Sequence, residues 1–92
     1  MTNAQRNKIQ SLSKKLSDIK ELIEEIRSDC EEAKGKKQES FDDKSEKWQE
    51  GEKGQEAQEA IEKMEEEDGH MDDAINNLDY AIDALSSIEQ EN

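Results

Sequence analysis

Apolar residues recur along the first third of the chain at alternating spacings of three and four. They fall at Ile9, Leu12, Leu16, Ile19, Ile23, Ile26, Cys30 and Ala33, and Leu22 widens the stripe. Such a heptad pattern is typical of a helix that packs along one side, and a disordered chain has no reason to keep it. The pattern predicts a helix over about residues 3–34.

A second heptad pattern predicts another helix over about residues 55–90. Its seam comprises Ala57, Ile61, Met64, Asp68, Met71, Ile75, Leu78, Ile82 and Leu85, and it is flanked by Ala60, Ala74, Ala81 and Ile88. A face widened in this way suits packing against two or more neighbours. The pair Asp68-Gly69 interrupts the seam, because an acid replaces an apolar residue beside a poor helix former. We expect a kink or weak point there, or a break into two shorter helices.

Residues 35–54, punctuated by three glycines, are predicted to form the elbow between these helices. Ser40 followed by Asp43 can cap a short helical turn, and Gly51 and Gly54 are candidate C-caps.

Two of the three aromatic residues, Phe41 and Trp48, lie in this elbow, seven residues apart. One interpretation is a hydrophobic plug that closes the end of the hairpin. The other is that Trp48 is an exposed anchor for a partner, since tryptophan is enriched among interface hot spots.

The two helices are of nearly equal length, which favours an all-α, antiparallel, coiled-coil-like hairpin forming a single domain over residues 1–92. Burial between only two helices leaves little net stability for so small a chain. We therefore predict self-association, most simply a dimer that forms a four-helix bundle. Its seam would contain Ile9, Leu12, Leu16, Ile19, Ile23, Ile26, Ile61, Met64, Met71, Ile75, Leu78, Ile82 and Leu85.

Charge is distributed unequally between the predicted helices. The net charge is −13, yet residues 1–34 carry seven bases and seven acids, whereas residues 55–92 carry one base and thirteen acids. One interpretation is a solubilising face, relieved partly by the bases of the first helix. The other is a stripe that binds a basic partner protein through Glu62, Glu65, Glu66, Asp72, Asp73 and Asp79.

Composition excludes several classes of function. There is no apolar run near the ~20 residues that cross a bilayer and no signal peptide, so we expect a cytoplasmic protein without membrane contact. The large negative charge argues against direct binding of nucleic acid.

Catalytic and metal-binding chemistry finds little support, and we expect no enzyme, cofactor or metal site. Antiparallel helices hinged near residue 45 place Cys30 opposite about residue 60, away from His70, so Cys30 is interpreted as a small buried side chain. An EF-hand loop with Gly69 at its sixth position would need Asp at its first position and Glu at its twelfth. These positions are Met64 and Ile75, whose side chains cannot bind calcium.

The elbow and the second helix resemble small acidic proteins of bacteriophages and prophages over about residues 22–90. The resemblance is carried by Glu31-Glu32, by Glu39-Ser40-Phe41, by the run from Ser45 to Gly54 that ends Gly-Glu-Lys-Gly, and by Ala57, Ile61 and Met64. Two further blocks belong to it, Ile75-Asn76-Asn77-Leu78 and Ile82-Asp83-Ala84-Leu85. It implies a phage accessory protein in a bacterial host cell, where such proteins can inhibit host enzymes or defence systems.

The leading hypothesis is a non-enzymatic module that inhibits or sequesters a host defence or DNA-handling protein through its acidic second helix. Mimicry of DNA by the acidic helix is one mechanism. Capture of a small ligand between helices of an oligomer is another, although the second helix has few bases to hold phosphates. The alternative from a different class is a structural coiled-coil or assembly protein with no inhibitory role.

Overall fold

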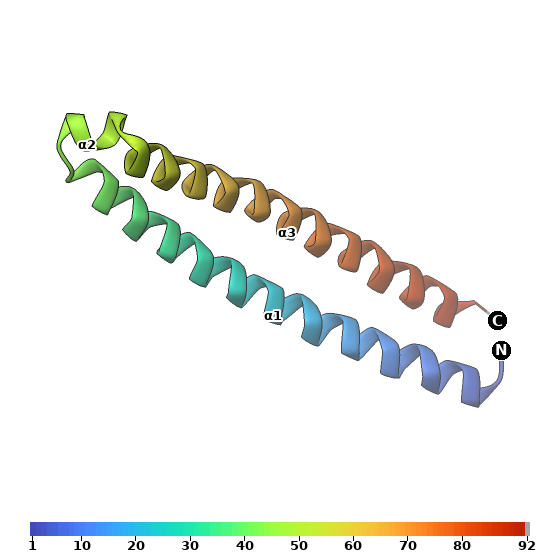
Figure 1. The fold of residues 1–92 in the computed structure, drawn as a ribbon. Helices are drawn as coiled ribbons and strands as arrows, with labels where there is room; N and C mark the ends of the chain where they lie inside the picture. The colour runs from blue at the N-terminus through green and yellow to red at the C-terminus, as the bar shows by residue number, and fades with distance from the viewer. Residues whose placement is uncertain (92) are drawn as a thin grey trace. The chain divides into compact units, whose positions relative to one another are not determined.

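The computed structural model describes residues 1–91, which form three helices: α1 (Asn3–Asp42), α2 (Glu46–Glu50) and α3 (Glu52–Gln90). The two long helices α1 and α3 are antiparallel, and the short α2 lies in the elbow that joins them (Figure 1). No strand occurs among the described residues. The prediction of an all-α hairpin of two long helices is confirmed.

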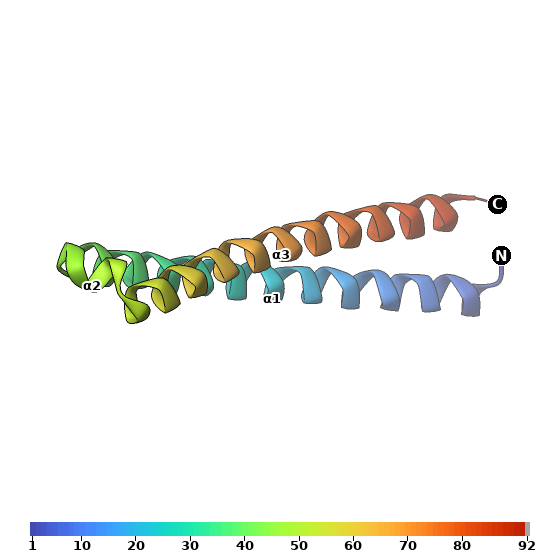
Figure 2. The same ribbon diagram turned by 45° about the horizontal axis from the view of Figure 1, so that its top comes forward.

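The chain divides into two compact units. Unit 1 consists of Met1–Glu25 and the C-terminal segment from Asp72 onward, so that the two ends of the chain lie at the same end of this unit (Figures 1 and 2). Unit 2 is the continuous segment Ile26–Met71, which contains the elbow. Each unit pairs one part of α1 with one part of α3.

In unit 1, apolar side chains of both helices form the seam. Ile9, Leu16 and Ile23 of α1 are half-buried, as are Leu78, Ile82 and Leu85 of α3, and Ile75 is buried. In unit 2 the buried apolar side chain is Ile61. Met64, one turn further along α3, and Cys30 of α1 are half-buried. No large side chain in the described chain is fully buried.

The seam of α3 agrees with its predicted register, whereas that of α1 differs by one residue at every second position. The α3 positions from Ala57 to Leu85 are all buried or half-buried. On α1, however, the predicted seam residues Leu12, Ile19 and Ile26 are exposed. The residues that follow them, Ser13, Lys20 and Arg27, are half-buried in their place.

This shift coincides with a row of ion pairs between the helices. Lys20, Arg27 and Lys34 follow one another at heptad spacing on α1, and each forms an ion pair with an acid of α3. Turning α1 to bring Leu12, Ile19 and Ile26 into the seam would separate these pairs. In the observed register the basic edge of α1 faces the acids of α3, and the second apolar row of α1 stays exposed.

Helix α1 is longer than predicted and the elbow is shorter. A reciprocal capping box starts α1: the Gln5 backbone N–H donates to Thr2 Oγ1 over 3.1 Å, and the Thr2 N–H donates to Gln5 Oε1 over 2.9 Å. The helix continues through Gly35 to Asp42 instead of ending at residue 34. A glycine inside a helix costs only about 1 kcal/mol, which the surrounding turns can offset.

The caps of the elbow also differ in part from the prediction. Ser40 lies inside α1, and the N-cap of α2 is Ser45, whose Oγ accepts the Trp48 N–H over 3.2 Å. Gly51 is the C-cap of α2, as predicted. Gly54 is not a C-cap, because α3 already begins at Glu52 and Gly54 lies in its first turn.

The interruption at Asp68-Gly69 does not break the second helix, since α3 runs without a gap from Glu52 to Gln90. Asp68 occupies a seam position because Arg27 of α1 lies opposite and binds it. Gly69 has open space where a Cβ would lie, so no neighbour requires a glycine at that position.

Candidate interaction surfaces

A row of ion pairs joins the helices within each unit. In unit 2, Arg27 binds Asp68 through two bonds, Nε to Oδ1 at 2.7 Å and one terminal nitrogen to Oδ2 at 3.1 Å. Lys34 lies 3.8 Å from Glu65. In unit 1, Lys20 lies 2.7 Å from Asp79, and the Gln10 side-chain amide donates to Glu89.

These contacts shift the pKa of the groups involved in the directions that ion pairing requires. The hydrogen bond from Arg27, with the charges of Arg27 and Lys34, lowers the pKa of Asp68, and partial desolvation opposes this. The hydrogen bond to Asp79 raises the pKa of Lys20. Both pairs are only partly shielded from water, which moderates their effect on stability.

The six acids predicted to bind a partner have different surroundings. Asp79 and Glu65 pair with lysines of α1, and Glu66 lies 3.9 Å from His70 on its own helix. Asp72 is half-buried at the start of the unit 1 part of α3. Glu62 and Asp73 are exposed and form no ion pair with any other described residue. The structure therefore assigns Asp79 and Glu65 to contacts within the hairpin.

An acidic surface lies on the part of α3 that belongs to unit 2. We define it by Glu56, Glu59 and Glu62, all of which are exposed and unpaired within the described residues. At about 100° per residue, these three positions fall on one face of α3, opposite the face that contacts α1. The acidic surface of unit 2 was not distinguished from the other acids in the sequence, although its spacing of three residues is visible there.

The elbow is built around two aromatic rings that contact each other. The ring centroids of Phe41 and Trp48 lie 6.2 Å apart at an angle of 65°, an edge-to-face arrangement. The Lys44 ammonium lies 5.4 Å from the centre of the Trp48 ring. Both rings are half-buried, so the aromatic pair closes unit 2 and still exposes part of its surface.

Gln49 was not singled out in the sequence, yet it holds the elbow together. Its side-chain amide donates to the backbone carbonyls of Phe41 at 2.9 Å and of Lys44 at 3.0 Å. Phe41 lies in the last turn of α1 and Lys44 in the loop that follows it, so Gln49 ties the end of α1 to that loop. No sequence motif marks a glutamine for this role.

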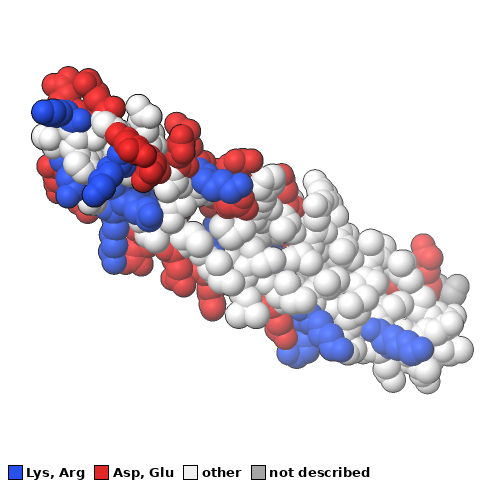
Figure 3. All heavy atoms as spheres, in the orientation of Figure 1, with Lys and Arg blue, Asp and Glu red and all other residues white. Residues whose placement is uncertain are grey.

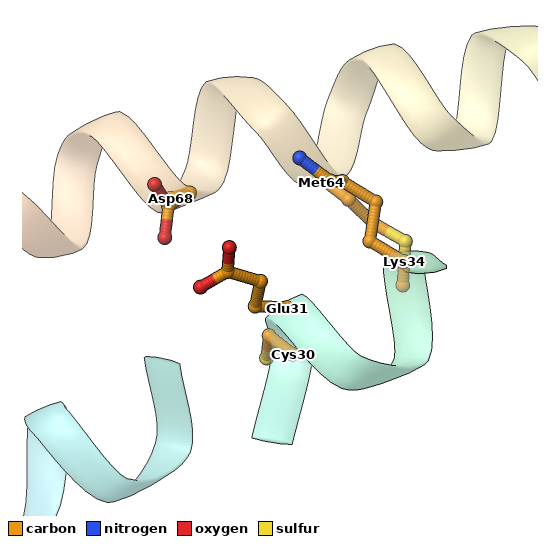
Figure 4. Close-up of a pocket in the computed structure, with 5 residues that line it drawn as sticks. All are labelled: Cys30, Glu31, Lys34, Met64 and Asp68. Atoms are coloured by element: carbon orange, nitrogen blue, oxygen red, sulfur yellow. The ribbon is translucent and has the colours of Figure 1, made fainter. Parts of the chain in front are cut away.

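A small depression between α1 and α3 in unit 2 is lined by Cys30, Glu31, Lys34, Met64 and Asp68 (Figure 4). Its volume is about 30 Å³, enough for one water molecule. The carboxylates of Glu31 and Asp68 both point into the gap between the helices. Cys30 thus faces Met64 and Asp68, rather than residue 60 as predicted, and His70 does not line the depression.

The charge of the surface differs between the units. Around the elbow in unit 2, acidic and basic side chains crowd together, whereas the face of unit 1 seen in Figure 3 is largely uncharged. In unit 1, Leu12, Ile19 and Leu22 of α1 expose 47%, 45% and 57% of their surface, and Ile88 of α3 exposes 42%. Among the described residues, no three His, Cys, Asp or Glu side chains are placed to hold a metal ion.

None of the helices in the described part of the chain combines the length and the apolar character required to cross a membrane. Comparisons with protein families, with curated proteins and with solved structures find no match to this chain.

Proposed function

We propose that this protein is a non-enzymatic interaction module that binds a partner protein with a basic surface through the acidic surface of unit 2. The observation that supports this is the lack of neutralisation at Glu56, Glu59 and Glu62. Lysines and arginines of α1 pair with acids beside the seam, but no described residue pairs with these three.

The charge of the two long helices explains why the acids stay unpaired. Helix α1 carries nine bases and nine acids, whereas α3 carries two bases and thirteen acids. Glutamates on one face of a helix repel each other, and a partner's Lys and Arg side chains relieve that repulsion. Such a surface also accelerates association with a basic protein, an effect that falls with added salt.

A DNA-handling or defence protein of a bacterial host fits this chemistry, since such proteins carry basic surfaces for nucleic acid. The protein would then inhibit or sequester its partner, as the resemblance to phage accessory proteins implies. If the glutamates occupy the partner's phosphate-binding positions, the inhibition works by mimicry of the DNA backbone.

Affinity capture from bacterial lysate with matched charge variants tests the proposal. Glu59→Gln with Glu62→Gln removes two charges from the acidic surface, and Glu21→Gln with Glu25→Gln removes two from exposed, unpaired positions on α1. We expect the wild type and the α1 variant to capture the same basic protein, and the α3 variant to lose it. Equal capture by both variants, or capture that does not weaken with salt, would exclude the acidic surface as the binding site.

We also propose that the chain works as a homodimer. It exposes 7044 Å² for a mass of 10.6 kDa, whereas a folded monomer of this mass exposes about 5,500 Å². Part of this surface belongs to the large apolar side chains of Leu12, Ile19, Leu22, Ile26 and Ile88, which are 42–57% exposed. The exposed leucine and isoleucine side chains support the structural alternative as well, a coiled-coil assembly protein whose only contacts are apolar. Loss of capture with the dimer intact would separate the binding module from that alternative.

A further inference from the structure

Unit 1 carries an apolar row on each helix, exposed on α1 and only partly covered by the hairpin on α3. In heptad notation with Ile9 at a, the α1 contacts fall at a and e, and Leu12 and Ile19 occupy the exposed d positions, with Leu22 at g. With Leu78 at a, the α3 contacts also fall at a and e, and its d positions are Ala74, Ala81 and Ile88.

The two d rows lie on the same side of the hairpin. Seen along one axis, heptad positions run clockwise around one helix and anticlockwise around its antiparallel neighbour, so that d positions fall on one side of the seam and b positions on the other. The ion pair of Lys20 with Asp79 and the bond of Gln10 to Glu89 each involve a b position and mark that other side.

These rows form one face, the apolar face of unit 1: Leu12, Ile19, Leu22, Ala74, Ala81 and Ile88. Because Lys20 meets Asp79, Ile19 lies at about the height of Ala81, and Leu12 lies one heptad further along at about the height of Ile88. None of the six side chains is charged.

We propose that this face binds a second copy of the chain, in a two-fold dimer that sets α1 of each copy against α3 of the other. This rests on the proposed self-association and not on the proposed basic partner. In such a dimer Ile19 packs over the partner subunit's Ala81, and the reciprocal contact forms by symmetry. A large side chain then opposes a small one, which allows the layers to interdigitate.

Charge favours this pairing of unlike helices. In unit 1, the segment Met1–Glu25 carries five bases and four acids, and the segment from Asp72 onward carries six acids and no base. Packing α3 against its own copy would place acids near acids. Packing it against α1 brings Lys8, at the g position of α1, to the height of the partner subunit's Glu91. The unpaired Glu56, Glu59 and Glu62 belong to unit 2 and take no part in this face.

Sedimentation of matched variants tests the face. Leu12→Glu with Ile19→Glu places unpaired carboxylates in the dimer interface, and we expect the dissociation constant of the dimer to rise at least about 100-fold. Tyr80→Glu is the control, because Tyr80 is 72% exposed at a c position outside the face. It makes the same apolar-to-acid change and should leave the dimer intact.

A cross-link that preserves the fold provides a second readout. Two chains, both with Cys30→Ser, carry a single new cysteine each: Ile19→Cys in one and Ala81→Cys in the other. Mixed and oxidised, they should form an interchain disulfide, and Ile19→Cys mixed with Tyr80→Cys should not. Circular dichroism confirms that each variant is helical.

The outcomes distinguish self-association itself from the assignment of the apolar face of unit 1 to the dimer interface. A wild-type dimer that the double glutamate variant dissociates, with the cross-link confined to the mixture of positions 19 and 81, supports the assigned face. A wild-type dimer that the double variant leaves intact overturns the face but not self-association. A wild-type chain that stays a folded monomer into the millimolar range overturns both, and leaves the acidic surface of unit 2 unaffected.

Discussion

Units 1 and 2 contain equal numbers of residues but are built from different side chains. Eleven leucine and isoleucine residues belong to unit 1 and two to unit 2, whereas unit 2 holds all four glycines and 24 of the 39 charged residues. Both units nevertheless form the same antiparallel pair of helices. Ion pairs join the helices in both units, but unit 1 adds extensive apolar packing, whereas unit 2 adds helix caps and an aromatic pair.

The difference also suggests separate tasks for the two units. Unit 1 has more apolar surface than its two helices can cover, which favours association with a like surface. Unit 2 has more negative charge than its lysines and arginines can neutralise, which favours a basic partner. Unit 1 has the exposed apolar surface and unit 2 the unpaired negative charge. Substitutions in one unit should therefore have effects that matched substitutions in the other do not.

The largest expected effect is the loss of a buried isoleucine. Ile75→Ala in unit 1 and Ile61→Ala in unit 2 should each lower the free energy of unfolding by about 2–4 kcal/mol, because Ile75 and Ile61 are 9% and 5% exposed. Urea unfolding followed by circular dichroism measures this. Tyr80→Ala, at a highly exposed position, should change it by less than about 0.5 kcal/mol. An Ile61→Ala variant as stable as wild type would mean that unit 2 has no apolar core to lose.

The next largest effect is expected on replacing Gly54 of unit 2, where the fold requires a glycine. A Cβ on Gly54 would lie 2.1 Å from the Gln49 carbonyl oxygen and 2.4 Å from that of Trp48. Gly54→Ala must therefore move α2 against α3, and we expect a loss of about 1–3 kcal/mol in thermal unfolding. Gly51→Ala, where the nearest atoms lie at 3.4 Å, should be tolerated. Equal effects of the two substitutions would contradict the close approach at Gly54.

A smaller effect on stability, of the opposite sign, is expected at glycines that no neighbouring atom requires. Gly35 and Gly69 lie inside α1 and α3, and no neighbouring atom lies within 4 Å of the place that an alanine methyl group would take. Gly35→Ala and Gly69→Ala should therefore each stabilise unit 2 by about 0.5–1 kcal/mol. The midpoint of thermal unfolding reports this gain. A loss of stability at Gly69→Ala would instead indicate that the chain needs a weak point there.

The smallest effect concerns the pair of Arg27 and Asp68, which water partly screens. The lowered pKa of Asp68 means that its contribution to stability is complete above the unfolded-state pKa of about 3.9 and is lost as the pH falls through the lower folded-state value. Asp68→Asn should therefore be less stable than wild type at neutral pH, with the difference disappearing in acid. A difference that persists unchanged at low pH would show that the charge is not its source.

The α3 seam was predictable because nearly all of its large apolar side chains, from Ile61 through Ile75 to Leu85, fall in one register, and its second row is mostly alanine. The α1 register was not, because its apolar stripe is wide enough for two. The observed register is the one in which Lys20, Arg27 and Lys34 meet acids on another helix, and a pattern along one helix does not contain those partners. The need for glycine at position 54 and the role of Gln49 likewise arise only once α2 folds back beside α1 and α3.

Amide hydrogen exchange, read by mass spectrometry across a dilution series, distinguishes the two units directly. Protection of residues 1–25 and 72–91 should rise with protein concentration as the apolar face of unit 1 is covered, and protection of residues 26–71 should stay low and independent of concentration. Protection that is uniform along the chain at every concentration, or a concentration dependence confined to residues 26–71, would contradict the division of tasks between the two units.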